Sequence, residues 1–316
     1  MNSSFLSFGQ LDISILIAII TTILAINVLK PFALSINLTD LPDNRKHHKG
    51  SIPLIGGLSM FFGFLVSIIL TDGDLSTNKY FLLAALILVT VGALDDHHDI
   101  SVISRFFFQI SAAVIVVIVA GVDIESIGTI VPFRGEILLN SWSIFFSITC
   151  VIVGINALNM SDGIHGLAGS TSLMTFLSLA FFAYIDGNKE SLIIAILMCA
   201  VIPPFLFYNL RSSTLSKKQI FMGDAGSMFL GLGIVWLLVS LSQGDTSSFS
   251  PVIGLWLFGV PLIDGVATVL QRAVKGQSPF KPDMNHLHHV LISIGCLLYT
   301  SPSPRDRTRS RMPSSA

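Results

Sequence analysis

Charge is what this sequence has least of: Asp, Glu, Lys and Arg make up only 12% of its 316 residues, whereas soluble domains carry about 25%. So few charges cannot cover a water-facing surface, and apolar residues make up 52% of the chain. Much of the surface is therefore expected to face lipid. The net charge is −1, which gives no reason to expect a nucleic-acid partner.

Cysteine is scarce as well. Cys150, Cys199 and Cys296 are widely spaced in apolar runs, which fits neither a disulfide framework nor a CxxC metal site. We interpret them as small hydrophobic residues that face lipid or the core. The first ten residues contain no Lys or Arg, so the first apolar run is predicted to be a retained span rather than a cleaved signal peptide.

Long apolar runs are abundant instead. A membrane-crossing helix needs about 20 predominantly apolar residues, and we find nine such runs near residues 11–30, 53–70, 80–94, 105–121, 142–158, 167–185, 190–208, 226–242 and 251–270. The pattern predicts an all-α polytopic membrane helix bundle with about nine complete spans.

The end of the chain departs from this pattern. A tenth apolar run begins at Val290 and stops after Leu298, too short to cross a membrane. Residues 299–316 are polar, basic and low in complexity. We therefore expect residues 1–298 to form the membrane domain, truncated at its C-terminus, and residues 299–316 to be a non-native tail.

Lysine and arginine are unevenly divided between alternate loops. One set of loops has only Lys79, Arg134 and Lys189, and the other has Arg45, Lys46, Lys49, Arg105, Arg211, Lys217, Lys218, Arg272, Lys275 and Lys281. Since cytoplasmic loops carry the excess of positive charge, the N-terminus is predicted to lie outside. Five polar clusters then fall on the cytoplasmic side, at residues 40–50, 95–99, 156–165, 221–226 and 278–289. Their one-sided distribution predicts a single cytoplasmic active site.

Two of these clusters place acids at the ends of predicted spans. Adjacent carboxylates such as Asp95 and Asp96 are costly there unless a cation or donors compensate them, which favours Mg²⁺ handling or activation of a phosphate nucleophile. The alternative is a solvated helix end, with Asp99 as the N-cap of the next helix. Asp224 lies between glycines just before a span, where it is placed to hold Mg²⁺ on a pyrophosphate or only to cap the helix.

The cluster at 156–165 is more specific. Asn156 and Asn159 are three residues apart and share a face if the span is helical through them, and Asp162-Gly163 then breaks the helix. Amide oxygens and a carboxylate at a helix end suit Mg²⁺ or a nucleoside diphosphate; the alternative is a capped helix end with a glycine turn.

The remaining clusters are cationic. The run from Arg45 to Lys49 could neutralise phosphates or only follow the charge bias of the loops. The histidine loop, behind Arg272 and Lys281, fits a diphosphate or sugar better than zinc; the alternative is a solvated loop. Its histidines are His286, His288 and His289.

Taken in order, the five motifs resemble those of the polyprenyl-phosphate N-acetylhexosamine-1-phosphate transferases (glycosyltransferase family 4), from about residue 40 to residue 289. They read DLPDNRKHHKGSIPLIGG, GALDDHHDIS, NALNMSDGIHGL, FMGDAGS and SPFKPDMNHLHH. The HLHH sequence is similar to the undecaprenyl-phosphate GlcNAc-1-phosphate transferase branch, whereas the peptidoglycan-precursor branch typically has three consecutive histidines.

The resemblance implies a multi-pass enzyme of the bacterial inner membrane that depends on Mg²⁺, with Mn²⁺ as the alternative cation. An oxygen of undecaprenyl phosphate attacks the β-phosphorus of a UDP-N-acetylhexosamine, GlcNAc being favoured. UMP is released, and the lipid-linked sugar diphosphate initiates a cell-surface glycan. A homodimer is compatible with this resemblance.

The resemblance also implies residue roles. Asp95 is expected to deprotonate or orient the lipid phosphate, with Asp96 and Asp162 as further catalytic residues, and Asp224 with Asn159 to hold the metal. The expected substrate-binding residues are Lys49, Asn156, His165, Asn209, Arg272, His286, His288 and His289. One departure stands out, because the family usually reads DGIDGL where this chain has DGIHGL, so that His165 lacks a permanent negative charge.

Three alternatives stay open. A phospho-N-acetylmuramoyl-pentapeptide transferase of peptidoglycan synthesis would be favoured by three consecutive histidines, which the loop does not have. A membrane transporter would carry acids in mid-span and repeat symmetry between its halves, but only Asp264 lies inside a predicted span away from its ends, and no repeat is found. An inactive fragment is the third alternative, because the tenth apolar run is cut short.

Overall fold

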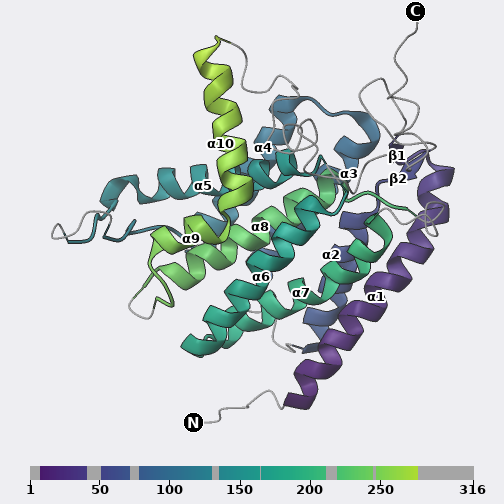
Figure 1. Ribbon diagram of the computed structural model, residues 1–316, viewed down its shortest axis with the longest axis horizontal. Helices are drawn as coiled ribbons and strands as arrows, with labels where there is room; N and C mark the ends of the chain where they lie inside the picture. The colour runs from purple at the N-terminus through teal and green to yellow at the C-terminus, as the bar shows by residue number, and fades with distance from the viewer. Residues whose placement is uncertain are drawn as a thin grey trace, which may run out of the picture.

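The computed structural model describes residues 8–40, 51–71, 78–129, 135–163, 165–210, 219–244 and 247–276. Helices make up almost all of its regular structure (Figure 1). They are α1 (Phe8–Ser35), α2 (Gly56–Thr71), α3 (Lys79–His98), α4 (Val102–Val114) with a π-helical continuation (Ile115–Val119), α5 (Ser143–Ser161) after a short 3-10 turn (Asn140–Trp142), α6 (Leu167–Asp186), α7 (Lys189–Asn209), α8 (Gly223–Ser242), α9 (Pro251–Leu257) and α10 (Gly259–Val274). Two short strands, β1 (Thr39–Asp40) and β2 (Ile52–Pro53), pair antiparallel.

Within the described residues, seven helices are long and apolar enough to cross a membrane, or eight if α9 and α10 form one bent span. This confirms the all-α polytopic membrane bundle. The number of nine complete spans is not confirmed, because α2 has only 16 residues and about 20 are needed. The outward position of the N-terminus stays a prediction, and the short tenth run and the tail lie outside the described residues.

The predicted span at 251–270 is broken in two, since α9 and α10 meet at 86°. Pro261 causes part of this break, because its nitrogen has no hydrogen to donate to the carbonyl of Leu257, four residues earlier. That carbonyl accepts a hydrogen bond from the hydroxyl of Thr175 in α6 at 2.9 Å instead. The prediction from sequence used only the length of the apolar run and therefore missed the break.

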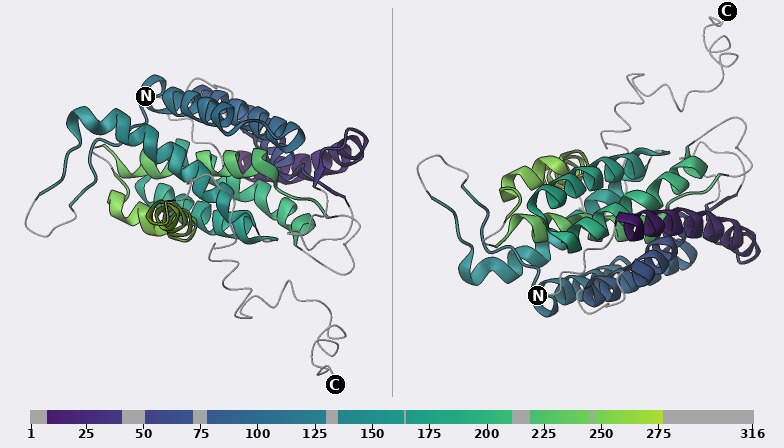
Figure 2. Two further views of the ribbon diagram at one scale, coloured as in Figure 1. Left: turned by 90° about the horizontal axis from the view of Figure 1, so that it is seen from above. Right: turned by 90° about the horizontal axis from the view of Figure 1, so that it is seen from below.

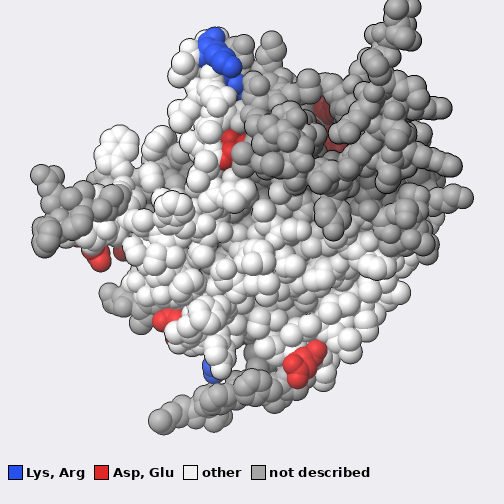
Figure 3. All heavy atoms as spheres, viewed as in Figure 1, with Lys and Arg blue, Asp and Glu red and all other residues white. Residues whose placement is uncertain are grey.

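The surface matches a membrane environment. Figure 3 shows a face whose broad middle is uncharged, with charged side chains toward its margins. Large apolar side chains of α1 project outward, among them Ile13, Leu16, Leu24, Val28 and Phe32.

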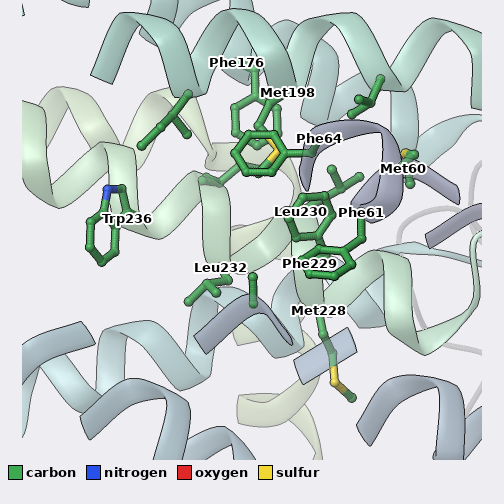
Figure 4. Close-up of a cluster of buried hydrophobic side chains, with 14 of the residues drawn as sticks. Met60, Phe61, Phe64, Phe176, Met198, Met228, Phe229, Leu230, Leu232 and Trp236 are labelled. Atoms are coloured by element: carbon green, nitrogen blue, oxygen red, sulfur yellow. The ribbon is translucent and has the colours of Figure 1, made fainter. Parts of the chain in front are cut away.

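Helix α8 is the centre of the bundle. In its span, 89% of the residues are buried, against 22% in α1, as expected for a helix that is apolar on all sides. It packs against α2, α3, α5, α6 and α7, and Figure 2 shows it between α3 on one side and α6 and α7 on the other. Aromatic rings pack against it: the ring centroid of Phe229 lies 5.5 Å from that of Phe61 and 5.6 Å from that of Phe64 (Figure 4). The ring centroids of Trp236 and Phe81 are 5.3 Å apart.

The first turn of α8 packs against its neighbours backbone to backbone. A Cβ atom at Gly57 would lie 2.0 Å from the nitrogen of Gly226, and one at Gly92 would lie 2.4 Å from the nitrogen of Ala225. Only glycine permits such an approach. The chain entering α8 is fixed as well, because the N–H of Phe221 donates to the carbonyl of Pro53 at 2.9 Å. Helices α2, α3 and α8 therefore meet rigidly at this end of the bundle.

We expect Gly92→Ala to push α3 away from the first turn of α8 and to cost about 1–3 kcal/mol of stability, as overpacking of a tight contact usually does. The thermal unfolding midpoint of the purified protein in detergent measures this cost. The matched control is Gly259→Ala, whose new Cβ would meet only the Cδ1 atom of Ile263 at 4.0 Å. Equal midpoints for the two variants would contradict the close packing at Gly92.

Candidate active site

Several helix ends converge beside the first turn of α8. Asp95 and Asp96 lie in the last turn of α3, Arg105 lies in the first turn of α4, and Asp224 lies in the first turn of α8. Asn159 is in the last turn of α5, and Asp162 follows that helix directly. The structure thus brings together three motifs that are far apart in the sequence.

Arg105 forms the ion pairs at the centre of this site. Its Nη1 atom lies 2.8 Å from Oδ2 of Asp95 and 3.1 Å from Oδ2 of Asp224. Within the described part of the chain, its buried Nε atom meets no hydrogen-bond acceptor. Sequence reasoning counted Arg105 only as a loop charge. It is the only Lys or Arg between Lys79 and Arg134. This isolated positive charge at a span end, ten residues after Asp95, could have indicated that Arg105 pairs with an acid of the site.

The two asparagines share a face of α5, as predicted, but have different partners. The Nδ2 atom of Asn159 donates to Oδ1 of Asp224 at 2.8 Å and to the hydroxyl of Ser227 at 2.9 Å. Because Nδ2 of Asn159 faces Asp224, the side-chain oxygen Oδ1 of Asn159 points elsewhere. The side-chain amide would have to rotate before Asn159 and Asp224 could bind the same cation. One turn deeper, Nδ2 of Asn156 donates to Oε1 of the fully buried Gln109 in α4 at 2.8 Å.

Neither Asp99 nor Asp224 is the N-cap of a helix. Asp99 lies at the end of α3 in a left-handed conformation, and α4 is capped by Ser101, whose hydroxyl accepts from the N–H of Ser104 at 3.2 Å. The alternative that Asp99 caps α4 is therefore wrong. The Asp224 side chain faces Arg105 and Asn159, and Asp96 accepts the N–H of Asp224 instead. Asp224 is thus no plain N-cap.

Asp162 follows the break that its sequence predicted, where α5 ends at Ser161. Part of its surface stays exposed. Even so, enclosure by protein atoms raises the pKa of Asp162 well above its usual range, and the nearby carboxylates of Asp224 and Asp96 raise it further. Both causes disfavour the charged form. The site therefore gathers more carboxyl groups than Arg105 alone could offset if all were charged.

Asn209 and His165 tie the turn after α5 to the chain that leads into α8. Asn209 is 4% exposed; its Oδ1 atom accepts from the N–H of Gly166 at 2.6 Å, and its Nδ2 atom donates to the carbonyl of Ile220 at 2.9 Å. The ring of His165 stacks on Phe221, with centroids 5.1 Å apart. Sequence reasoning assigned no function to Phe221.

The remaining predicted site residues are placed in part. Arg272 is 5% exposed on the inward face of α10, a helix that packs on α5 and rises out of the bundle (Figure 1). Its contact with substrate stays a prediction. Lys49, His286, His288 and His289 lie outside the described residues.

The donor chemistry of the site fits a hard cation. Carboxylate oxygens of Asp95 and Asp224 and the carboxamide oxygen of Asn159 are ligands that Mg²⁺ accepts. Among the residues that the structure describes, no three His, Cys, Asp or Glu side chains are already arranged as a metal site. Arg105 occupies one oxygen of each carboxylate. A cation here would therefore have to share these carboxylates with Arg105 or take its place.

Comparison with known proteins gives a consistent result. A model of the family described as glycosyl transferase family 4 matches residues 79–242. A Salmonella typhi protein named undecaprenyl-phosphate alpha-N-acetylglucosaminyl 1-phosphate transferase is 39% identical over 276 residues, which cover 87% of this chain and 74% of that protein. Proteins of the same name from Escherichia coli K12 and Haemophilus influenzae are each 36% identical, over 83% and 90% of this chain and 71% and 79% of their own lengths.

We expect Arg105→Met to leave Asp95 and Asp224 without the cation that they share and to cost about 1–3 kcal/mol, as carboxylates that lose a charged partner do. Added Mg²⁺ should raise the thermal unfolding midpoint of this variant more than that of the unchanged protein, because the cation would replace the missing charge. Lys275→Met removes an exposed cation at the end of α10 and serves as the control. A Mg²⁺ response no larger than that of the control would contradict this account of the site.

Proposed function

Since the chain belongs to glycosyl transferase family 4, we propose that it transfers GlcNAc-1-phosphate from UDP-GlcNAc to undecaprenyl phosphate and releases UMP. The reaction would take place at the cytoplasmic face of the bacterial inner membrane and start a cell-surface glycan. The observation that carries the proposal is the Asp95–Arg105–Asp224 group at one end of an apolar bundle, where a lipid-anchored phosphate and a soluble nucleotide can meet.

The alternatives are less well supported. The relatives carry the name of a GlcNAc-1-phosphate transferase, which favours that reaction over transfer of phospho-N-acetylmuramoyl-pentapeptide. A transporter would need its acids along a path through the membrane. Here Asp95, Asp96 and Asp224 gather at helix ends, beside the first turn of α8.

In the proposed reaction, an oxygen of undecaprenyl phosphate forms a bond to the β-phosphorus of UDP-GlcNAc while the bond from that phosphorus to the bridging oxygen breaks, and UMP leaves. Asp95 would orient the lipid phosphate or accept its proton. Arg105 holds Asp95 and Asp224 within a short distance of each other and would supply positive charge near the transferred phosphoryl group. Catalysis of this kind rests mainly on positioning and charge stabilisation.

Asp224, with Asn159 after its amide has turned, would hold Mg²⁺ or Mn²⁺. When bound, such a cation would offset the negative charge of the diphosphate. It would also relieve the repulsion among Asp162, Asp224 and Asp96 that raises the pKa of Asp162. The excess of carboxylates over cations in the site supports this assignment.

The substrate contacts remain part of the proposal. His165 and Arg272, together with Lys49 and the three histidines after Arg272, would contact the nucleotide, the diphosphate or the sugar. The amides of Asn156 and Asn209 are engaged inside the protein, so these two residues would act by holding the elements that carry the site. A homodimer is compatible with this arrangement and is not required by it.

The proposal is tested with membranes that contain this chain in a bacterial host lacking its own enzyme of this type, supplied with labelled UDP-GlcNAc, undecaprenyl phosphate and Mg²⁺. We expect a tunicamycin-sensitive lipid-linked product and an equal amount of UMP. Asp224→Asn should lower the rate by about 10²–10³-fold, the usual cost of removing one group that stabilises developing charge.

The matched control is Asp186→Asn. Asp186 is the last residue of α6, lies outside this site and accepts a hydrogen bond from the hydroxyl of Ser248. Its activity should equal that of the unchanged chain. Failure to form the lipid product, or an Asp224→Asn variant as active as the control, would rule out the proposed function.

A further inference from the structure

The two adjacent acids of α3 point to different neighbours. Successive residues of an α-helix point about 100° apart, so the side chains of Asp95 and Asp96 point in different directions. Asp95 faces Arg105. Asp96 faces the backbone of α8, where its Oδ1 atom accepts the N–H of Asp224 at 2.9 Å and its Oδ2 atom accepts the N–H of Ala225 at 3.4 Å.

These two N–H groups belong to the first turn of α8, and the first N–H groups of a helix have no partner inside that helix. A side chain just before the helix usually accepts them. In α8 that position is held by Met222, whose thioether is a poor acceptor. The carboxyl group of Asp96 from α3 takes its place as the acceptor of these N–H groups.

Two glycines make room for this contact. Gly223 has a positive φ of 72°, and a Cβ atom there would lie 2.4 Å from Oδ2 of Asp96. Gly92 precedes Asp96 by one turn of α3, and a Cβ atom there would lie 2.4 Å from the nitrogen of Ala225. The close approach of α3 to α8 and the carboxylate that bridges them therefore form one packed unit.

We propose that Asp96 is a positioning residue that holds the backbone of Asp224 and thereby sets where the Asp224 carboxylate lies relative to Asp95 and Arg105. The inference rests on the proposed function and gives the two acids different roles. Asp95 faces the reacting groups, and Asp96 fixes the helix that carries Asp224. It differs from the expectation from sequence that Asp96 is a further catalytic residue.

The test compares Asp96→Asn with Asp96→Ala in the transferase assay and measures kcat and KM separately. Asparagine is a good helix cap and keeps the oxygen that accepts the N–H of Asp224, so Asp96→Asn should retain activity within about tenfold. Asp96→Ala should lower kcat by about 10²-fold, as a displacement of about 1 Å can, while KM for UDP-GlcNAc changes by less than about twofold.

A second measurement does not depend on activity. Hydrogen exchange of the backbone amides of residues 222–228 should be faster in Asp96→Ala than in the unchanged chain and close to normal in Asp96→Asn. The thermal unfolding midpoint of each variant separates this local effect from general unfolding. If the unchanged chain has no transferase activity, the proposed function fails, whereas the exchange measurement still tests the contact.

Gly223→Ala provides an independent variant, because its new Cβ would collide with the Asp96 carboxylate. The loss of kcat caused by Gly223→Ala should be smaller when Asp96 is already alanine, since the colliding oxygens are then absent. The proposal is overturned if Asp96→Asn is as inactive as Asp224→Asn with normal exchange and stability. Normal kcat or normal exchange in Asp96→Ala, or fully additive losses in the double variant, would overturn it as well.

Discussion

Carboxylates at the end of an apolar helix bundle cost free energy unless cations or hydrogen-bond donors face them. In this protein Arg105 faces Asp95 and Asp224, the amide of Asn159 faces Asp224, and the first N–H groups of α8 face Asp96. This need constrains the surrounding helices: the C-terminal ends of α3 and α5 and the N-terminal ends of α4 and α8 must lie close together. Under the proposed function, a cation bound together with a phosphate would add to this compensation.

The rigidity of α8 gives these contacts their precision. The helix is buried on all sides, and aromatic rings fix its middle. Its first turn is pressed against α2 and α3 at Gly57 and Gly92. Asp224 is therefore carried by one of the least mobile kinds of element in a protein, and small shifts of α3 or α8 would change the distances on which phosphoryl transfer depends.

Much of this arrangement could be predicted from the sequence. Apolar length gave the membrane bundle, the asparagine spacing gave the shared face of α5, and Asp162-Gly163 gave the end of that helix. The pairing of Arg105 with Asp224 and the cap from Asp96 could not be predicted, because each joins residues that are distant in the chain. The bend near Pro261 was missed because apolar length alone does not show where a helix breaks. Periodicity describes one helix at a time and contains no information on its neighbours.

Under the proposed function, the Asp95–Arg105–Asp224 group receives a divalent cation during the reaction. Anomalous diffraction from crystals of the full chain grown with Mn²⁺ and UDP-GlcNAc tests it most directly. The account predicts a single strong Mn²⁺ peak in contact with a carboxylate oxygen of Asp224, with Arg105 moved away from that oxygen. An unchanged pair between Arg105 and Asp224, with Mn²⁺ bound elsewhere, would contradict it.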